Sequence, residues 1–304
     1  MDPDSKPDRP VLVVCASGQL GTRVVRQLVA EGRPVRALVR PTSRQGHLRQ
    51  AGVQAVHGDP ADPASLDAAC QGAGPVIANA NAVAPLHGSR FAAVGDRGYA
   101  ALLQAVQRQA CGRFVLILVP VTPHDDALPL FRYKRLIERR LPARGDEAAP
   151  VHRPWGFLQT FMGAVGGLIE KRGIALVPGP ADTRHAFIAV DDVAQVLVAA
   201  TTHPATLNAQ LEVGGPQWLS WRDVAALYAQ VLGRPVRTVS TPGAVFRAQQ
   251  WLMRPFSEAA SNIMGLNWLA SRTLPIADPG HAAALGITPI TAEQFLRHKA
   301  ALPA

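Results

Sequence analysis

A turn between a strand and a helix carries the first residues whose spacing could do chemistry. Cys15, Gly18 and Gly21 stand three positions apart, between the apolar strand 11–14 and an amphipathic helix. Unpaired backbone N–H groups and the positive end of the helix dipole meet at such a turn and attract a pyrophosphate. Gly18 would let phosphates approach the backbone, and Gly21 would let the helix lie close to the strand. An ordinary turn of a parallel α/β domain has the same composition, so the turn alone leaves both interpretations open.

Arg40 follows the second apolar strand, where the adenosine ribose of a bound dinucleotide would lie. An acidic residue there binds the 2′-hydroxyl of NAD, whereas an arginine pairs with the 2′-phosphate of NADP. Thr42 and Ser43 can add hydroxyl donors. A solvated arginine at a strand end is the alternative. If the turn binds a nucleotide, Arg40 favours NADP(H).

Three further side chains stand where they could meet such a nucleotide. Asp59 follows the third strand and could meet the adenine edge, although it could equally be a turn carboxylate. Asn79 ends the fourth strand, and ligands of open parallel sheets lie off strand ends. Lys134, on the helix after the fifth strand, could hold the nicotinamide ribose and lower the pKa of a proton donor. Tyr133 points about 100° away around that helix, so it cannot share the face of Lys134.

The elements that would position these residues alternate regularly. Apolar strands at 11–14, from 35, 53–56, 76–78, 114–118 and 151–152 are separated by helical segments. Such alternation predicts an α/β fold with a doubly wound parallel sheet. Beyond Trp155 strands and helices no longer alternate regularly. We expect a helix at 157–171, a strand at 186–190 and a helical region at 242–274. We therefore expect a disordered tail 1–10, a Rossmann domain 11–154, and a mostly helical substrate lobe 155–304 whose strands return to the main sheet.

Composition narrows the class of protein. The net charge is +9, but the arginines are spread along the 304 residues without interleaved aromatics, so we expect no nucleic-acid partner. No apolar run approaches the roughly 18 residues that span a bilayer, and we expect no membrane partner. Cys15, Cys70 and Cys111 are too scattered for a metal or disulfide framework. These features predict a cytoplasmic protein without a metal, and a homodimer is among the expected assemblies.

The order of several motifs resembles a known family. VLVVCASGQLG, VRALVR, the Gly58-Asp59 step, FRYKRLIERRL, VHRPWGF, HAFIAVDDVAQVLVAA and LEVGGPQWLSWRDVAALYAQVLGRPV are similar to the atypical short-chain dehydrogenase/reductases of the NmrA-like, NAD(P)H-binding type, from about residue 11 to about 240. The resemblance implies an extended Rossmann fold with a small C-terminal substrate lobe. The cofactor contacts that we expect are Ser17, Gly18, Gln19, Leu20, Gly21, Arg40, Ser43, Asp59, Asn79, Lys134 and Pro154.

The chain departs from the short-chain reductases at the usual catalytic acid. Their tyrosine, four residues before the lysine, is Leu130 here, and their serine or threonine after the fifth strand is replaced by Leu118-Val119-Pro120. Leucine and valine cannot donate a proton, so either another acid serves or a carbon acceptor takes the hydride while solvent supplies the proton. Lys134 is one candidate, His124 beside Asp125 is a second, and His185 is a third. We expect Phe131, Trp155, Phe157 and Phe161 to form an apolar substrate wall, although core packing is their alternative role.

Two functions of different classes follow from this pattern. The first is an NADPH-dependent reductase of a small hydrophobic substrate, of aromatic, quinone, enone or polyketide-like character. The second is a non-catalytic NADP(H)-binding redox sensor that acts through a protein partner, which the missing tyrosine and serine favour.

Overall fold

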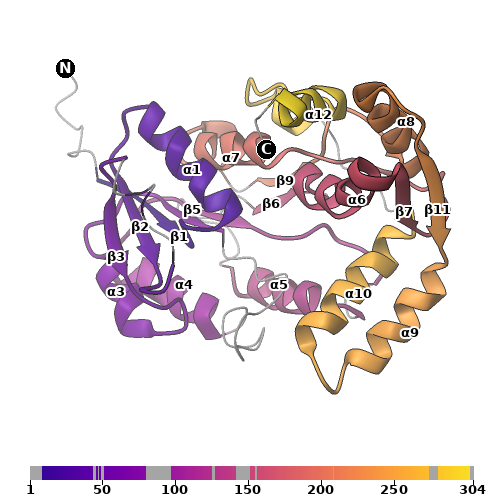
Figure 1. Ribbon diagram of the computed structural model, residues 1–304. Helices are drawn as coiled ribbons and strands as arrows, with labels where there is room; N and C mark the ends of the chain where they lie inside the picture. The colour runs from indigo at the N-terminus through magenta and orange to yellow at the C-terminus, as the bar shows by residue number, and fades with distance from the viewer. Residues whose placement is uncertain are drawn as a thin grey trace.

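A seven-stranded sheet forms the centre of the molecule (Figure 1). The computed structural model describes residues 9–43, 46, 48, 51–79, 97–124, 127–141, 151–154, 156–207, 209–273 and 280–301. The strand order is β3-β2-β1-β4-β5-β6-β9, and neighbouring strands are parallel. The strands are β1 (Val11–Val14), β2 (Val35–Val39), β3 (Gln54–His57), β4 (Val76–Ala78), β5 (Phe114–Ile117), β6 (Val151–Pro154) and β9 (Gln210–Val213). The doubly wound Rossmann-type sheet expected from the sequence is confirmed, and β9 joins it from beyond residue 155.

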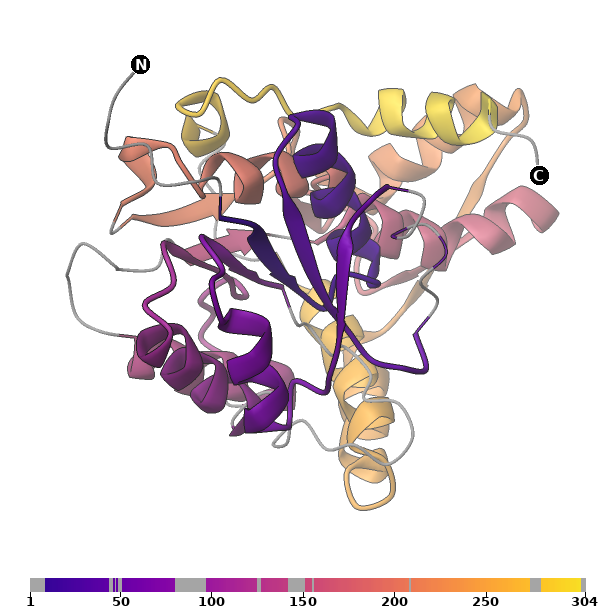
Figure 2. The same cartoon turned by 90° about the vertical axis from the view of Figure 1, so that its left-hand side faces the viewer.

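Helices cover both faces of this sheet (Figure 2). On one face lie α1 (Gln19–Ala30) and α7 (Val190–Ala199), and on the other lie α3 (Pro63–Cys70), α4 (Tyr99–Arg108) and α5 (Pro129–Arg140). Side chains alternate along β1, so Val11 and Val13 pack toward α1 while Leu12 and Val14 pack toward α3 and α4. Burial on both faces explains why β1 is continuously apolar.

The chain beyond residue 155 builds a second, mostly helical part. Its helices are α6 (Leu158–Arg172), α8 (Trp221–Leu232), α9 (Gly243–Met253), α10 (Glu258–Ala270), α11 (Gly280–Ala283) and α12 (Ala292–Ala301), with the short 3₁₀ helix η3 (Pro204–Thr206). Two small sheets complete it: β7 (Ile174–Pro178) pairs in parallel with β11 (Arg237–Thr241), and β8 (Arg184–His185) pairs antiparallel with β10 (Leu219–Ser220). Helices α9 and α10 form a hairpin at one end of the molecule (Figure 1).

The structure corrects three details of the expected elements. The expected strand 186–190 is wrong, because Ile188 forms only an isolated bridge with Phe157 and α7 already begins at Val190. That segment is apolar because it is buried, and burial alone does not distinguish a strand from other backbone. The expected helical region 242–274 contains two separate helices, α9 and α10. The sequence did not predict strand β7. Residues 1–8 of the expected tail, and Trp155, lie outside the described residues.

Within the described part of the chain, we find no helix long and apolar enough to cross a membrane.

Candidate functional site

The turn between β1 and α1 has the shape that its spacing suggested. Among the described residues, only Cys15 and Ala110 adopt a positive φ without being glycine, and Cys15 does so at +62°. This conformation costs roughly 1 kcal/mol for a residue with a side chain. A Cβ atom on Gly21 would lie 2.3 Å from the Cys15 carbonyl oxygen, so only glycine lets α1 approach the turn. A Cβ on Gly18 would meet that oxygen alone, at 3.4 Å, and the space beside Gly18 is open to a ligand.

The N-cap residue of α1 has no side chain to offer to the first turn of the helix. This residue, Gly18, makes no capping hydrogen bond through a side chain, and the first turn carries no acidic residue. The positive end of the helix therefore faces the open space beside Gly18. Asn79, buried at the end of β4, supports this turn: its amide oxygen accepts from the Gly21 N–H at 3.0 Å and its amide nitrogen donates to the Val14 carbonyl. The side chain predicted as a cofactor contact thus holds the shape of the turn.

Lys134 is the most unusual charged group near these strand ends. It is 3% exposed, and its Nζ donates to the Ile117 carbonyl at 3.0 Å and to the Tyr99 hydroxyl at 3.5 Å. The same Nζ lies 5.0 Å from the centre of the Tyr99 ring. Burial lowers the pKa of Lys134 to about 7, because the charged ammonium loses its hydration. Tyr133 is only half-buried on a different face of α5, as the helical geometry predicted.

The structure brings residues from distant parts of the chain near the end of β1. The Cys15 thiol lies close enough to Arg40, Lys134 and Asp59 to interact electrostatically, and burial raises the pKa of this thiol to about 11. Arg40 is exposed just after β2, and its carbonyl accepts from the Ser43 N–H at 2.9 Å. The Asp59 carboxylate accepts from the Ala61 N–H at 2.8 Å. These charges therefore surround one point at the carboxyl edge of the sheet.

The remaining expected cofactor contacts occupy the same turn or a neighbouring strand end. Ser17 is half-buried, Gln19 is exposed and Leu20 is buried. Pro154 ends β6, where its backbone pairs with Val213 of β9. Their contact with a nucleotide stays a prediction.

The positions of the usual catalytic hydroxyls are filled by packed apolar residues. Leu130 is buried, and its N–H donates to Asn262 Oδ1 at 3.2 Å. Leu118 and Val119 are buried as well, and the Thr122 hydroxyl accepts from the His124 N–H at 3.2 Å. The hydroxyl that lies beside Lys134 belongs to Tyr99 at the start of α4. Sequence reasoning missed Tyr99, because 35 positions separate it from Lys134 and no motif links the two.

The two histidine candidates lie among aromatic rings of the second part of the chain. His185 is buried with its ring 5.3 Å from Phe187 and 5.2 Å from Trp221, and burial lowers its pKa to about 4. It is therefore a neutral imidazole at physiological pH. His124 is half-buried, with its ring 4.9 Å from that of Trp268. Asp125 lies outside the described residues.

The residues expected to form an apolar substrate wall do not share one surface. Phe131 is buried in a cluster with Leu128 and Trp268, whereas Phe157 packs against the core between the sheet and α7. Phe161 belongs to a third cluster, around His185. Each of the three therefore also packs a core, and their contact with a substrate stays a prediction.

Comparison with known proteins places the chain in a family of nucleotide-binding proteins. The model of the NmrA-like family matches residues 7–264. The chain is 31% identical to an NAD(P)H azoreductase of Xenophilus azovorans, over 76% of each protein. It is 24% identical to the photosystem II assembly factor Ycf39 of Cyanophora paradoxa, over 76% of this chain and 71% of the relative.

A solved structure with a similar fold is that of an NADPH-dependent quinone oxidoreductase from Escherichia coli. It superimposes with a TM-score of 0.73 at 17% identity, covering 95% of this chain and 99% of the other. The sheet, the glycine turn and the family match agree, and the chain belongs to the NmrA-like family.

Proposed function

We propose that this protein is an NADP(H)-dependent reductase of a small hydrophobic substrate, of aromatic, quinone, enone or polyketide-like character. The buried Lys134, beside the glycine turn and with a pKa of about 7, is the observation that carries the proposal. A lysine with this pKa populates both its charged and its neutral form near neutrality, as a general acid requires. The relatives named as NAD(P)H-dependent reductases support the same class of activity.

The residues of the site fit a dinucleotide phosphate. The open space beside Gly18 and the N-terminus of α1, where the N-cap residue has no side chain, suit a pyrophosphate. Arg40 is exposed just after β2, and this position supports a pairing of its guanidinium with a 2′-phosphate. When bound, NADPH supplies the hydride.

Lys134 is the proposed proton donor, since the usual tyrosine and serine are absent. Lys134 holds a proton at Nζ, and the Tyr99 hydroxyl at 3.5 Å orients that ammonium group. A hydride acceptor whose reduced form is basic could take this proton, or could take one from solvent.

Arg40→Ala tests the nucleotide assignment. We expect the affinity for NADPH, measured by isothermal titration calorimetry, to fall ten- to a hundredfold, because a charge-assisted pair with the 2′-phosphate contributes about 1.5–3 kcal/mol. The affinity for NADH should change little. Arg26→Ala, which removes an exposed arginine of α1, is the matched control. Equal losses for both nucleotides would show that Arg40 does not recognise the 2′-phosphate.

Turnover tests the reductase itself. The oxidation of NADPH is followed at 340 nm with a panel of quinones, enones, aldehydes and azo compounds. We expect substrate-dependent oxidation with at least one of these classes.

A non-catalytic NADP(H) sensor is the second candidate. The apolar residues Leu118, Val119 and Leu130, which stand where the usual catalytic hydroxyls would be, favour it. The relative named as an assembly factor is consistent with a role exerted through proteins. Stoichiometric NADPH binding without oxidation across the panel would select this candidate.

A further inference from the structure

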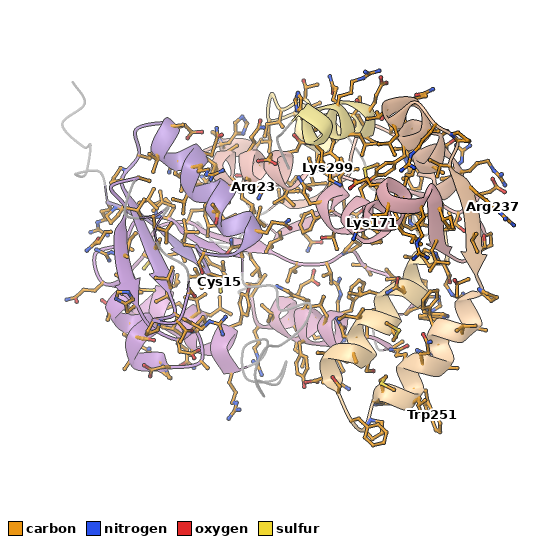
Figure 3. All side chains as sticks on the ribbon, viewed as in Figure 1. Cys15, Arg23, Lys171, Arg237, Trp251 and Lys299 are labelled. Atoms are coloured by element: carbon orange, nitrogen blue, oxygen red, sulfur yellow. The ribbon has the colours of Figure 1, made fainter. Side chains whose placement is uncertain are left out.

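A large cavity lies away from the nucleotide-binding turn, between α5, α9 and α10. Its volume is about 1570 Å³. Four aromatic side chains line it: Tyr133, Trp251, Phe256 and Trp268. Figure 3 shows Trp251 at the free end of the α9–α10 hairpin, far from Cys15. None of the residues expected to contact the cofactor lines this cavity.

The side chains that line the cavity carry an excess of positive charge. Four arginines line it, Arg132, Arg247, Arg254 and Arg272, against one acidic residue, Glu258. In the part of the chain that the structure describes, none of these arginines forms an ion pair with a carboxylate. An excess of arginine over carboxylate among the lining residues that the structure describes creates a positive potential that attracts anions.

Trp268 holds two of these charges in place. The guanidinium carbons of Arg247 and Arg272 each lie 4.6 Å from the centre of its ring. The ring itself is 8% exposed and packs in a buried cluster with Leu128 and Phe131, so its orientation is fixed. Two cations beside one ring repel each other, and an anion placed near both would remove that repulsion.

A hydrogen-bond relay orients Arg247 further. Its Nη1 donates to Gln250 Oε1 at 2.7 Å, and Gln250 Nε2 donates to the Ala127 carbonyl at 2.6 Å. Gln250 is 5% exposed. The guanidinium is therefore ordered before any ligand arrives, which lowers the entropy cost of binding.

The cavity opens on a different face of α5 from the one that carries Lys134. Pro129, Arg132 and Tyr133 line the cavity, whereas Leu130, Lys134 and Ile137 are buried. The mean directions of these two sets lie about 110° apart around the helix. The cavity is thus a second site, separate from the strand ends.

We propose that this cavity binds a small aromatic anion, such as an aryl carboxylate or aryl sulfonate. The acidic group pairs with Arg247 and Arg272, and the rings of the ligand stack on the aromatic lining. Ligand pockets commonly have about 300–1,000 Å³, so this cavity accommodates a molecule of two or more fused rings.

A matched pair of ligands tests the proposal. Naphthalene-2-sulfonate and the neutral naphthalene-2-sulfonamide share their ring system and differ in charge. Binding to the full chain is measured by isothermal titration calorimetry with NADPH present. We expect one sulfonate per chain, bound at least tenfold more tightly than the sulfonamide.

Variants locate the site. Each of the variants Arg247→Gln and Arg272→Gln should lower the affinity for the sulfonate at least fivefold and leave the affinity for the sulfonamide unchanged. Arg237→Gln, on the outer strand β11 (Figure 3), is the charge-matched control and should change neither affinity. Arg254→Gln, an exposed position at the end of α9, provides a further variant should removal of an arginine beside Trp268 disturb folding.

Two results would overturn the proposal. One is equal affinity for the sulfonate and the sulfonamide. The other is unchanged sulfonate binding in Arg247→Gln, Arg272→Gln and Arg254→Gln, with thermal unfolding confirming that the variants are folded. Neither result depends on whether the protein reduces a substrate.

Discussion

Lys134 shows how burial changes the chemistry of one residue. A lysine on a helix is ordinarily solvated, but this one is enclosed beneath the strand ends with the Ile117 carbonyl and the Tyr99 hydroxyl as acceptors. Its pKa of about 7 lies well below the usual 10.5. The ammonium therefore loses its charge within the physiological range, which is what a proton donor near neutrality requires.

The lowered pKa also predicts how stability depends on pH. Between pH 7 and pH 10.5 the unfolded chain retains the Lys134 proton while the folded chain releases it. The free energy of unfolding should therefore increase with pH across this window, by up to about 1.4 kcal/mol per pH unit. Lys134→Met removes this contribution. We expect the melting temperature of the variant, relative to the parent, to be higher at pH 6 than at pH 9, as measured by calorimetry. A difference that is constant with pH would contradict the lowered pKa.

At the scale of elements, the glycine turn and α1 form one unit. Gly21 lets the helix contact the Cys15 carbonyl and Ala16, while Gly18 borders open space. The two glycines thus have separate tasks, one in packing and one in approach by a ligand. Cys15 takes a left-handed conformation before both glycines, at the place where the dinucleotide fingerprint has its first glycine.

Paired alanine substitutions separate these tasks. Gly21→Ala places a Cβ against backbone atoms that cannot move aside, and should destabilise the fold by about 2–4 kcal/mol. Gly18→Ala should cost less, about 1 kcal/mol, because φ is −74° and the only loss is that alanine is a poorer N-cap than glycine. It should nevertheless weaken NADPH binding more than tenfold by filling the space beside the turn. Urea denaturation and calorimetric titration measure the two effects. Equal stabilities for the two variants would refute the packing role of Gly21.

At the scale of the whole molecule, a buried carboxylate joins the sheet-covering helix α7 to the C-terminal segment. Asp192 is 1% exposed, and its Oδ2 accepts from the Ile290 N–H at 3.1 Å. Burial raises the pKa of Asp192 to about 6. Because the folded state then binds the proton more tightly than the unfolded state, stability is lost as pH rises from about 4 to 6.

Asp192→Asn keeps an acceptor for Ile290 and removes the titration. We expect the variant to be more stable than the parent at pH 7, by up to about 3 kcal/mol, with a smaller difference at pH 4. Urea denaturation at the two pH values is the measurement. Asp191→Asn, at the exposed neighbour that pairs with Arg23 at 2.9 Å, is the control and should change stability by less than about 1 kcal/mol. A parent that is more stable than Asp192→Asn at pH 7 would contradict the prediction.

The sequence predicted the fold better than the site. Strands β1, β4 and β5 were recognisable because strands buried on both faces are continuous apolar runs. The segment 186–190 was misassigned for the same reason, since its apolar residues are buried without forming a ladder. The site was less predictable than the fold, because no motif links Tyr99 to Lys134. The two side chains meet only when α4 and α5 pack on the same face of the sheet.

What the sequence by itself determined is local: the turn from Cys15 to Gly21, the arginine after the second strand, the alternation of strands and helices, and the loss of the usual tyrosine at Leu130. These features depend on spacing within a few residues. Only the tertiary structure decided which distant side chains meet: Tyr99 with Lys134, the Cys111 thiol with the Cys70 carbonyl at 3.4 Å, and four arginines around one cavity. The physical reason is that burial and electrostatic environment arise from packing between elements, and packing sets both the pKa of Lys134 and the unbalanced charge beside Trp268.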